Sequence, residues 1–519
     1  MHPLKRLTIA TALLLAATLP RVVSAAASLP STNVAWLPAA VDADIDRAFA
    51  QAKAQAKPVL LYWGASWCPP CNQLKATLFN RQDFAAQSKS FVAVHIDGDR
   101  PSAQKLGARF KVGGYPTLIL FTPAGNEITR LPGEADAPQV MALLQAGLAG
   151  GRPIADVLGD ARADKTITAN EWRMLSFHSW EIDESGLVDK AARPAVLAEL
   201  ATKSQAQGDN EVSTRLWLKA LAASDDGKGV KPDAALRQRV QRVLADPALS
   251  RTHMDVLING ASDIVKVLSS DDGADRAPLV AQFDAALVRL QNDSSLSRGD
   301  RTSALIERVD LARLGQPKDA TKPVLPPALL QEVRVMAARM DREISDPYER
   351  MAVITAVAYM QGQAGLWADS DALLKANLAK THSPYYLMSQ LGSNARKLGK
   401  KDEALRWYQQ AYDKSEGPAT RLQWGASYIG ALVDLAPADA ARIEKATTQV
   451  FADAAKDPGS FHDRSARSLQ RVGKRLASWN ADGKHAASIK RLQVRLDGLC
   501  AQVGAAERET CTGLLQAKA

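Results

Sequence analysis

Two of the four cysteines in this chain of 519 residues lie close together in the segment LYWGASWCPPCNQLKA, residues 61–76. Only Pro69 and Pro70 separate Cys68 from Cys71. Two thiols at this spacing can close a small disulfide ring and exchange electrons with another disulfide. They can also form an inert structural disulfide or supply two ligands to a metal ion.

A cysteine pair provides only two of the ligands that a tetrahedral zinc ion needs. No second Cys pair and no His pair lies at ligand spacing elsewhere in the sequence. The sequence therefore favours redox chemistry, and we predict no metal and no cofactor. Structural zinc, a copper-handling role and an inert disulfide are the alternatives.

The residues on either side of the pair predict where the two sulfurs lie. An apolar, strand-like run precedes Cys68 and a helical pattern follows it, so Cys68 is expected where a strand passes into a helix. Free backbone N–H groups and the helix dipole stabilise a thiolate there. We therefore predict that Cys68 attacks and that Cys71, one turn further, resolves. Pro69 and Pro70 offer no N–H, fit the first helical turn and stiffen the ring.

The elements that position the pair follow an alternating pattern. Alternation of helical and strand-like segments over residues 41–147 predicts an α/β domain. We expect strands at 58–63, 91–97, 117–121 and 127–131, and helices at 41–55, after Cys68, near 102–110 and at 137–148. The turn sequence PAGN between the last two strands is typical of an antiparallel hairpin.

The motif WCPPC at a strand-to-helix junction, followed by GGYPTLILF at residues 113–121, resembles the thioredoxin family. The resemblance covers residues 41–149. The segment KPVLLYWGASWCPPCNQLKATLFN, residues 57–80, is most similar to exported reductase domains at the C-terminus of transmembrane reductant transporters. The GYPT form also resembles that of protein disulfide isomerases.

The resemblance implies roles for particular residues. Pro116 is expected to follow a cis peptide bond and to lie against the cysteine pair, where Trp67, Tyr115 and Pro116 bind the substrate. Many thioredoxins have a buried Asp six residues before the first Cys, but this sequence has Tyr62 there. A phenol with an ordinary pKa of about 10 accepts a proton poorly at neutral pH. We therefore assign Tyr62 a redox-supporting place beside the cysteine pair. The absence of a carboxylate at this position argues against fast general disulfide reduction.

Three titratable residues lie within the predicted strand at 91–97 or shortly after it. We interpret Asp97 and Asp99 as turn residues at the strand end, and His95 as a packed or solvated strand residue.

Strand patterns end after GLAGGRP, residues 147–153, which predicts a linker before an α-helical domain over 150–519. Within it, residues 391–418 match the small-residue offsets of one tetratricopeptide repeat, so we expect a tetratricopeptide-like array of helical hairpins that binds a partner. Three aromatic residues are interpreted as core residues: Trp407, Trp424 and Tyr428.

The other two cysteines, Cys500 and Cys511, lie in a terminal helical segment. In an oxidising compartment an even number of cysteines favours pairing, so we predict a structural disulfide between them. A second redox pair that relays electrons is the alternative.

The start of the chain indicates the compartment. Residues 1–25 contain Lys5 and Arg6, an apolar run at 7–19, and small residues before Ala25, as a secretory signal peptide does. We predict cleavage after Ala25, an N-terminal linker over 26–40 and a periplasmic location, where disulfides persist.

Composition narrows the class of partner. No later stretch reaches the roughly 18 apolar residues of a membrane helix, so no stable membrane insertion is expected. The formal net charge of +9 is spread without long basic runs, which disfavours nucleic-acid binding. The expected partners are disulfide-containing exported proteins and a redox partner in the membrane.

Taken together, the patterns predict an α/β thioredoxin-like domain followed by an all-α helical-hairpin domain. The predicted function is that of a periplasmic thiol:disulfide oxidoreductase of the reductase or isomerase type. The alternative is a helical scaffold of the cell envelope whose thioredoxin fold is mainly a docking module.

Overall fold

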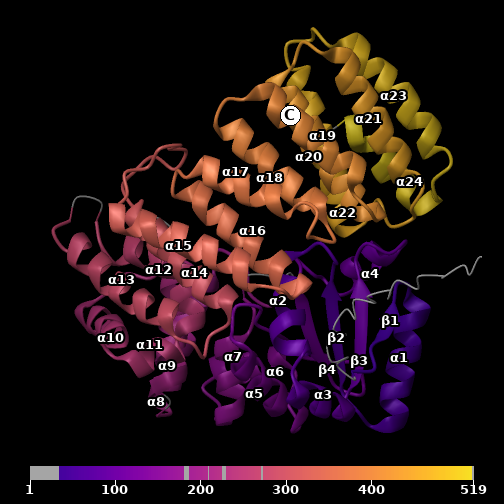
Figure 1. Ribbon diagram of the computed structural model, residues 1–519. Coiled ribbons are helices and arrows are strands. Elements are labelled where there is room, and N and C mark those ends of the chain that lie inside the picture. The colour runs from indigo at the N-terminus through magenta and orange to yellow at the C-terminus, as the bar shows by residue number, and fades with distance from the viewer. Residues whose placement is uncertain (1–33, 181–185, 209, 225–228, 271–272, 517–519) are drawn as a thin grey trace, which may run out of the picture.

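A computed structural model describes residues 34–180, 186–208, 210–224, 229–270 and 273–516 (Figure 1). The predicted signal peptide and the first part of the predicted N-terminal linker lie outside the described residues. Within the described ranges, no helix is both long enough and apolar enough to cross a bilayer.

The first part of the chain forms the predicted α/β fold. Its elements are β1 (Leu37–Ala39), α1 (Asp42–Gln55), β2 (Val59–Gly64), α2 (Pro69–Leu74), a π-helical turn (Lys75–Phe79), α3 (Gln82–Gln87), a 3-10 turn (Ser88–Ser90), β3 (Val92–Asp97), α4 (Ala103–Arg109), β4 (Thr117–Phe121), β5 (Glu127–Leu131) and α5 (Ala137–Leu148).

These strands make one five-stranded sheet in the order β1-β3-β2-β4-β5. The pairs β1–β3 and β2–β3 are parallel, whereas β2–β4 and the predicted hairpin β4–β5 are antiparallel. All six residues of the central strand β2 are buried, because helices cover both faces of the sheet. The carboxyl end of β2 delivers the cysteine pair to the start of α2.

The predicted linker over 26–40 is wrong at its end. Leu37–Ala39 form the edge strand β1, paired with Val94–Ile96 of β3. A strand of three residues is too short to produce a readable alternation of apolar and polar side chains.

The rest of the described chain is all helical, as predicted. Its helices are α6 (Ile154–Arg162), α7 (Ala169–Phe177), α8 (Arg193–Ala206), α9 (Asn210–Ala222), α10 (Ala234–Ala245), α11 (Pro247–Thr252), α12 (Met254–Leu268), α13 (Arg276–Asn292), α14 (Arg298–Ala312), α15 (Pro327–Glu343), α16 (Pro347–Gln363), α17 (Trp367–Asn377), α18 (Pro384–Lys397), α19 (Lys401–Lys414), α20 (Pro418–Leu435), α21 (Ala440–Ala454), α22 (Asp463–Trp479), α23 (Ala486–Cys500) and α24 (Ala505–Thr512), with a final 3-10 turn (Gly513–Leu515).

The segment with the repeat-like pattern forms the hairpin α18–α19. The helices approach closely at Gly392, where an added Cβ would lie 3.1 Å from the ring of Tyr408. A glycine there lets the two backbones come together, as the small-residue pattern predicts. The tetratricopeptide nature of the whole region stays a prediction.

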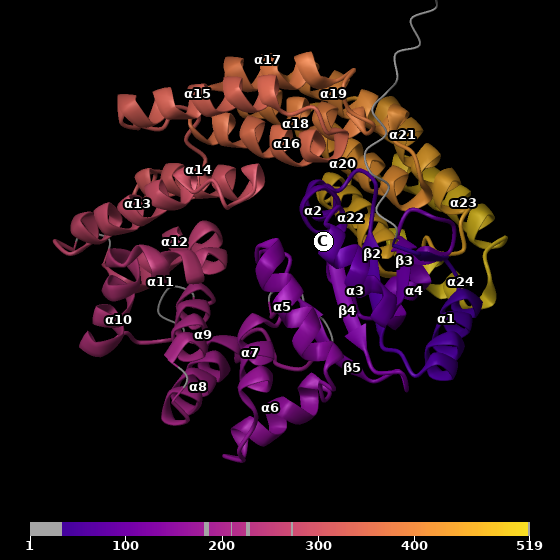
Figure 2. The same ribbon diagram turned by 60° about the horizontal axis from the view of Figure 1, so that its bottom comes forward.

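The helical region curves around the α/β domain as an arc (Figure 2). Along the arc, α16 packs against α2, and α22 packs against α4. One hydrophobic cluster contains Leu60 of β2, Leu144 of α5, Ile154 of α6 and Trp424 of α20. The core is therefore continuous from the sheet into the helical region.

Candidate active site

The redox pair lies at the start of α2. The structure joins Cys68 and Cys71 in a disulfide with their Cα atoms 5.2 Å apart. Cys68 is the extended N-cap residue of α2, and its Sγ accepts a hydrogen bond of 3.1 Å from the N–H of Cys71. Because Pro69 and Pro70 have no N–H, the Cys71 amide is the first N–H of the helix. It lies where it can stabilise negative charge on Cys68.

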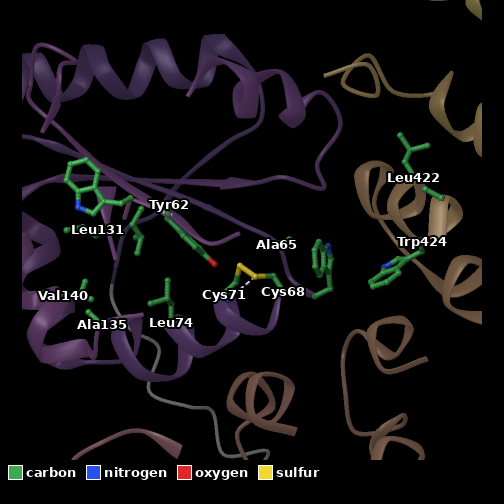
Figure 3. Packing of buried hydrophobic residues seen from close by; sticks show 14 of the residues in the cluster. Tyr62, Ala65, Cys68, Cys71, Leu74, Leu131, Ala135, Val140, Leu422 and Trp424 are labelled. Carbon is green, nitrogen blue, oxygen red and sulfur yellow. Dashed lines mark hydrogen bonds between the residues drawn. A yellow bond between two sulfur atoms is a disulfide. The ribbon is translucent and has the colours of Figure 1, made fainter. Parts of the chain in front are cut away.

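The two cysteines differ in their surroundings. Figure 3 shows Tyr62 on the Cys71 side of the disulfide, with its hydroxyl directed toward the sulfurs, and Trp424 on the Cys68 side. Cys71 is fully buried and Cys68 is 2% exposed. Neither sulfur is open to a bulky protein surface in this arrangement.

Tyr62 is a buried phenol whose hydroxyl has no hydrogen-bond partner among the described residues. Its ring stacks on His95 at a centroid distance of 4.8 Å. Burial, with a smaller effect of the Asp97 carboxylate, raises the pKa of Tyr62 further above its ordinary value. Burial also lowers the pKa of His95 to about 4. Both side chains are therefore neutral at neutral pH, and Tyr62 can donate a hydrogen bond but not act as a base.

The loop before β4 forms the other side of the site. The Tyr115–Pro116 peptide bond is cis. The Tyr115 ring stacks on Trp63 at 5.5 Å and meets the edge of Trp67 at 5.7 Å, and its hydroxyl accepts a hydrogen bond from Gln104. The loop and the tryptophan before the cysteine pair are thus in direct contact.

Asp99 has a role that the turn interpretation missed. Its carboxylate accepts a hydrogen bond from Trp67 Nε1 at 2.6 Å. It also accepts from the Thr420 backbone N–H at 2.8 Å and from Thr420 Oγ1 at 2.6 Å. Burial is the main cause that raises the pKa of Asp99 to about 6. Asp99 therefore links the residue before the redox pair to α20 of the helical region.

Three side chains of the helical region lie over Trp67, and we call them the helical cover: Tyr386, Trp424 and Arg464. Tyr386 stacks on Trp67 at 6.0 Å, and Trp424 meets it edge-on at 6.3 Å. The Arg464 guanidinium lies 4.9 Å from the ring centres of both Trp67 and Tyr115, a cation–π geometry. The helical cover therefore buries Trp67, and Cys68 belongs to the same buried hydrophobic cluster as Trp67 and Trp424.

Polar contacts extend this attachment on both sides of the site. His382 Nε2 lies 2.8 Å from the carbonyl of Ser66, and Gln73 donates to Ser297 at 2.7 Å. Trp424 is buried, as predicted, but it packs against Trp67 in the candidate site of the α/β domain. Residues so far apart in the chain give no local sequence signal.

The remaining cysteines are also paired. The structure joins Cys500 of α23 to Cys511 of α24, with their Cα atoms 5.7 Å apart. Both are buried. Among the described residues, no three His, Cys, Asp or Glu side chains gather in a way that could hold a metal ion.

Comparison with known proteins supports the domain assignment. Residues 45–148 match the family model of a thioredoxin-like domain. Two curated relatives from Pseudomonas aeruginosa are thiol:disulfide interchange protein DsbD 2, 34% identical over 120 residues, and DsbD 1, 32% identical over 112 residues. A third is the thiol:disulfide interchange protein DsbD of Cronobacter sakazakii, 37% identical over 99 residues.

These matches are short relative to both partners. The matches cover 22%, 21% and 18% of this chain, and 20%, 19% and 17% of the respective relatives. The chain thus spans about a fifth of the length of these relatives. The α/β part is a thioredoxin-like domain with a Cys-Pro-Pro-Cys disulfide, similar to a region of DsbD.

Proposed function

We propose that this chain is a periplasmic thiol:disulfide oxidoreductase that reduces disulfides in exported proteins. The observation that carries the proposal is the Cys68–Cys71 disulfide at the start of α2, with the Cys71 N–H donating to the Cys68 sulfur and a cis-proline loop beside it. Similarity to proteins named for thiol:disulfide interchange supports the same chemistry.

The reaction needs two exchanges. The Cys68 thiolate attacks one sulfur of a substrate disulfide, which forms a mixed disulfide and releases the other substrate sulfur as a thiolate. That thiolate takes the proton of Cys71. The Cys71 thiolate then attacks Cys68 Sγ, which releases the second substrate thiolate and closes the Cys68–Cys71 disulfide. Two electrons pass from the protein to the substrate, and a redox partner in the membrane would restore the dithiol.

Tyr62 fits this scheme as a hydrogen-bond donor. Its neutral hydroxyl can stabilise the Cys71 thiolate, but it cannot remove the Cys71 proton at neutral pH. We therefore assign the removal of that proton to the leaving thiolate of the substrate.

The helical region is proposed to be a tetratricopeptide-like scaffold that selects a protein partner. Its arc places α14, α16, α18 and α20 around the redox pair, which supports a role in deciding what reaches the sulfurs. No nucleic acid is expected among the partners.

Burial of the pair favours a second candidate function. Cys68 is only 2% exposed under the helical cover, which suits a scaffold of the cell envelope whose thioredoxin fold is a docking module. In that case the disulfide would persist without exchange.

Trapping of mixed disulfides tests the two functions. Full-length Cys71→Ser should accumulate covalent complexes with exported proteins, because its mixed disulfides cannot be resolved, whereas Cys68→Ser should form almost none. Complexes separated under non-reducing conditions and released by a reductant give the yield. Equal trapping by both variants would reject Cys68 as the attacking residue. Absence of trapping and of any exchange by the wild-type chain would favour the scaffold.

A further inference from the structure

The helix α24 is held in place by very few side chains. It has eight residues, all of them described, and Cys511 is the one that is buried. The disulfide from Cys511 to Cys500 joins α24 to α23. The following 3-10 turn adds Leu514, which is buried at Gly473 of α22. Because an isolated helix of this length is unstable in water, the position of α24 depends strongly on the disulfide.

Glu507 is the residue with which α24 reaches the α/β domain. Its Oε1 accepts a hydrogen bond of 2.9 Å from the Lys105 ammonium of α4 and lies 3.3 Å from His462 Nε2, just before α22. The hydrogen bond from Lys105 is the main cause that lowers the pKa of Glu507, so this carboxylate is ionised at neutral pH. Figures 1 and 2 both show α24 beside α4. A mostly exposed helix is thus attached to the domain that carries the redox pair.

The start of α4 is also a place where the helical cover is attached. Gln104 accepts a hydrogen bond of 3.1 Å from the backbone N–H of Arg464, which belongs to the cover. The same side chain donates to the Tyr115 hydroxyl in the cis-proline loop. Lys105, the partner of Glu507, is the next residue along α4. The contact of α24 therefore stabilises α4 in the position in which α4 holds the cover.

We propose that the Cys500–Cys511 disulfide is a redox-sensitive latch that controls access to the redox pair. While the latch is closed, α24 and Glu507 help to hold the helical cover over Cys68. When a dithiol reduces the latch, α24 detaches and the cover lifts more readily. The reductant is a protein dithiol, the same class as the partner that would restore the dithiol of Cys68 and Cys71. The inference rests on the proposed function and adds a regulation of the pair to it.

Opening the latch is a thiol–disulfide exchange. One thiolate of the reductant attacks a sulfur of the Cys500–Cys511 bond, and the other cysteine leaves as a thiolate that takes a proton. The second thiolate of the reductant then attacks its own sulfur in the mixed disulfide, which releases the remaining cysteine. Two electrons and two protons pass to the latch, and the reductant becomes a disulfide. Both sulfurs are buried in the closed chain, so local unfolding of the short helix α24 precedes the attack.

Labelling of Cys68 reports whether the latch holds the cover. In full-length Cys71→Ser, Cys68 is a free thiol that reacts with iodoacetamide when the cover lifts. Adding Cys500→Ser and Cys511→Ser fixes the latch open. The labelling rate of Cys68 in the folded chain should then rise about three- to tenfold, since one partly exposed ion pair alone contributes up to about fivefold. An unchanged rate would overturn the latch.

Two variants that keep the disulfide separate the latch from a general loss of stability. In the Cys71→Ser background, Glu507→Gln removes the charge that pairs with Lys105 and should raise the labelling rate about two- to fivefold. Glu509→Gln is the matched control, because Glu509 is exposed on the same helix. Its labelling rate should equal that of the parent. Equal rates in the two variants would refute the role of Glu507 in holding the cover.

A titration with dithiothreitol tests the redox step. The Cys71→Ser chain is equilibrated in mixtures of reduced and oxidised dithiothreitol, freed of the reagent and briefly labelled. Mass spectrometry gives the reduced fraction of Cys500 and Cys511 and the labelling of Cys68 in the same samples. The two curves should share one midpoint while near-UV circular dichroism shows a folded chain, whereas the chain with serines at both latch positions should label equally in every mixture.

The titration can also contradict the latch. Reduction of Cys500 and Cys511 that occurs only when urea unfolds the chain would overturn the proposal. So would a labelling curve of Cys68 that does not follow their reduction. Both results would leave the proposed function intact, because that function is tested separately by the trapping of mixed disulfides.

Discussion

Replacing Thr420 by valine should weaken the attachment of the helical cover. The variant keeps the shape of the side chain but removes the hydroxyl that donates to Asp99 at 2.6 Å. Among the described residues, Asp99 then retains two donors, Trp67 Nε1 and the Thr420 backbone N–H. A hydrogen bond to an ionised group contributes about 1.5 to 3 kcal/mol. The equilibrium for lifting the cover should therefore shift by a factor of about 10 to 150.

Alkylation of Cys68 measures this equilibrium. In a Cys71→Ser background Cys68 is a free thiol, and its burial requires the cover to lift before iodoacetamide can react. At pH 8 the Asp99 carboxylate is ionised, since its pKa is about 6. Mass spectrometry of the peptide that contains Cys68 gives the labelling rate. Thr420→Val should increase this rate by the factor above while the urea-unfolded chain labels equally in both forms.

Thr447→Val is the matched control. Thr447 is a fully buried threonine of α21 whose hydroxyl has no hydrogen-bond partner among the described residues. Its replacement should leave the labelling rate of Cys68 within a factor of about two of the rate in the Cys71→Ser parent. Equal labelling of Thr420→Val and the parent, at equal thermal stability, would show that the Asp99 contact does not hold the cover. If Cys68 of the folded Cys71→Ser parent were labelled as fast as in the urea-unfolded chain, the cover would be no barrier to the reagent.

Three further predictions concern other groups. Because the pKa of Asp99 is raised from 3.8 to about 6 in the folded state, its contribution to stability is fully present below pH 4 and lost as pH rises through 6. The free energy of unfolding from urea titrations should fall by up to about 3 kcal/mol between pH 4 and 7 relative to Asp99→Asn; a parallel pH profile in the variant would contradict this. Tyr62→Phe should lower the reduction potential of the pair by about 30 mV against glutathione, because the Cys71 thiolate loses a donor; a higher or equal potential would reject that role. Cys511→Ser should reduce the hydrogen-exchange protection of α24 by about 3 kcal/mol if the bond to Cys500 is structural, whereas unchanged protection would favour a relay role.

The redox pair and its sheet could be predicted because their signals are local. The apolar run of β2 ends at Gly64, shortly before the WCPPC motif, and α2 begins within that motif at Pro69. The loop GGYPT precedes another apolar run, which becomes β4. Each feature depends on neighbours within a few positions, where strand and helix periodicity can be read from the sequence.

The enclosure of the pair could not be predicted because its contacts join distant segments. Asp99 and Thr420 are 321 positions apart. The local sequence around an aspartate that follows a strand is the same whether its carboxylate only ends a turn or also accepts hydrogen bonds from a distant helix. Trp424 has the spacing of a core residue, and it is buried. Periodicity predicts that a side chain is buried but not which surface buries it.

The arc also sets how the cover can move. The arc begins at α6, directly after α5 of the α/β domain, and the residues of the cover lie in α18, α20 and α22 (Figure 2). Between these points the arc is held to the same domain at α16, which packs against α2, and at α22, which packs against α4. Lifting the cover from Trp67 is therefore coupled to a movement of these two helices against the α/β domain.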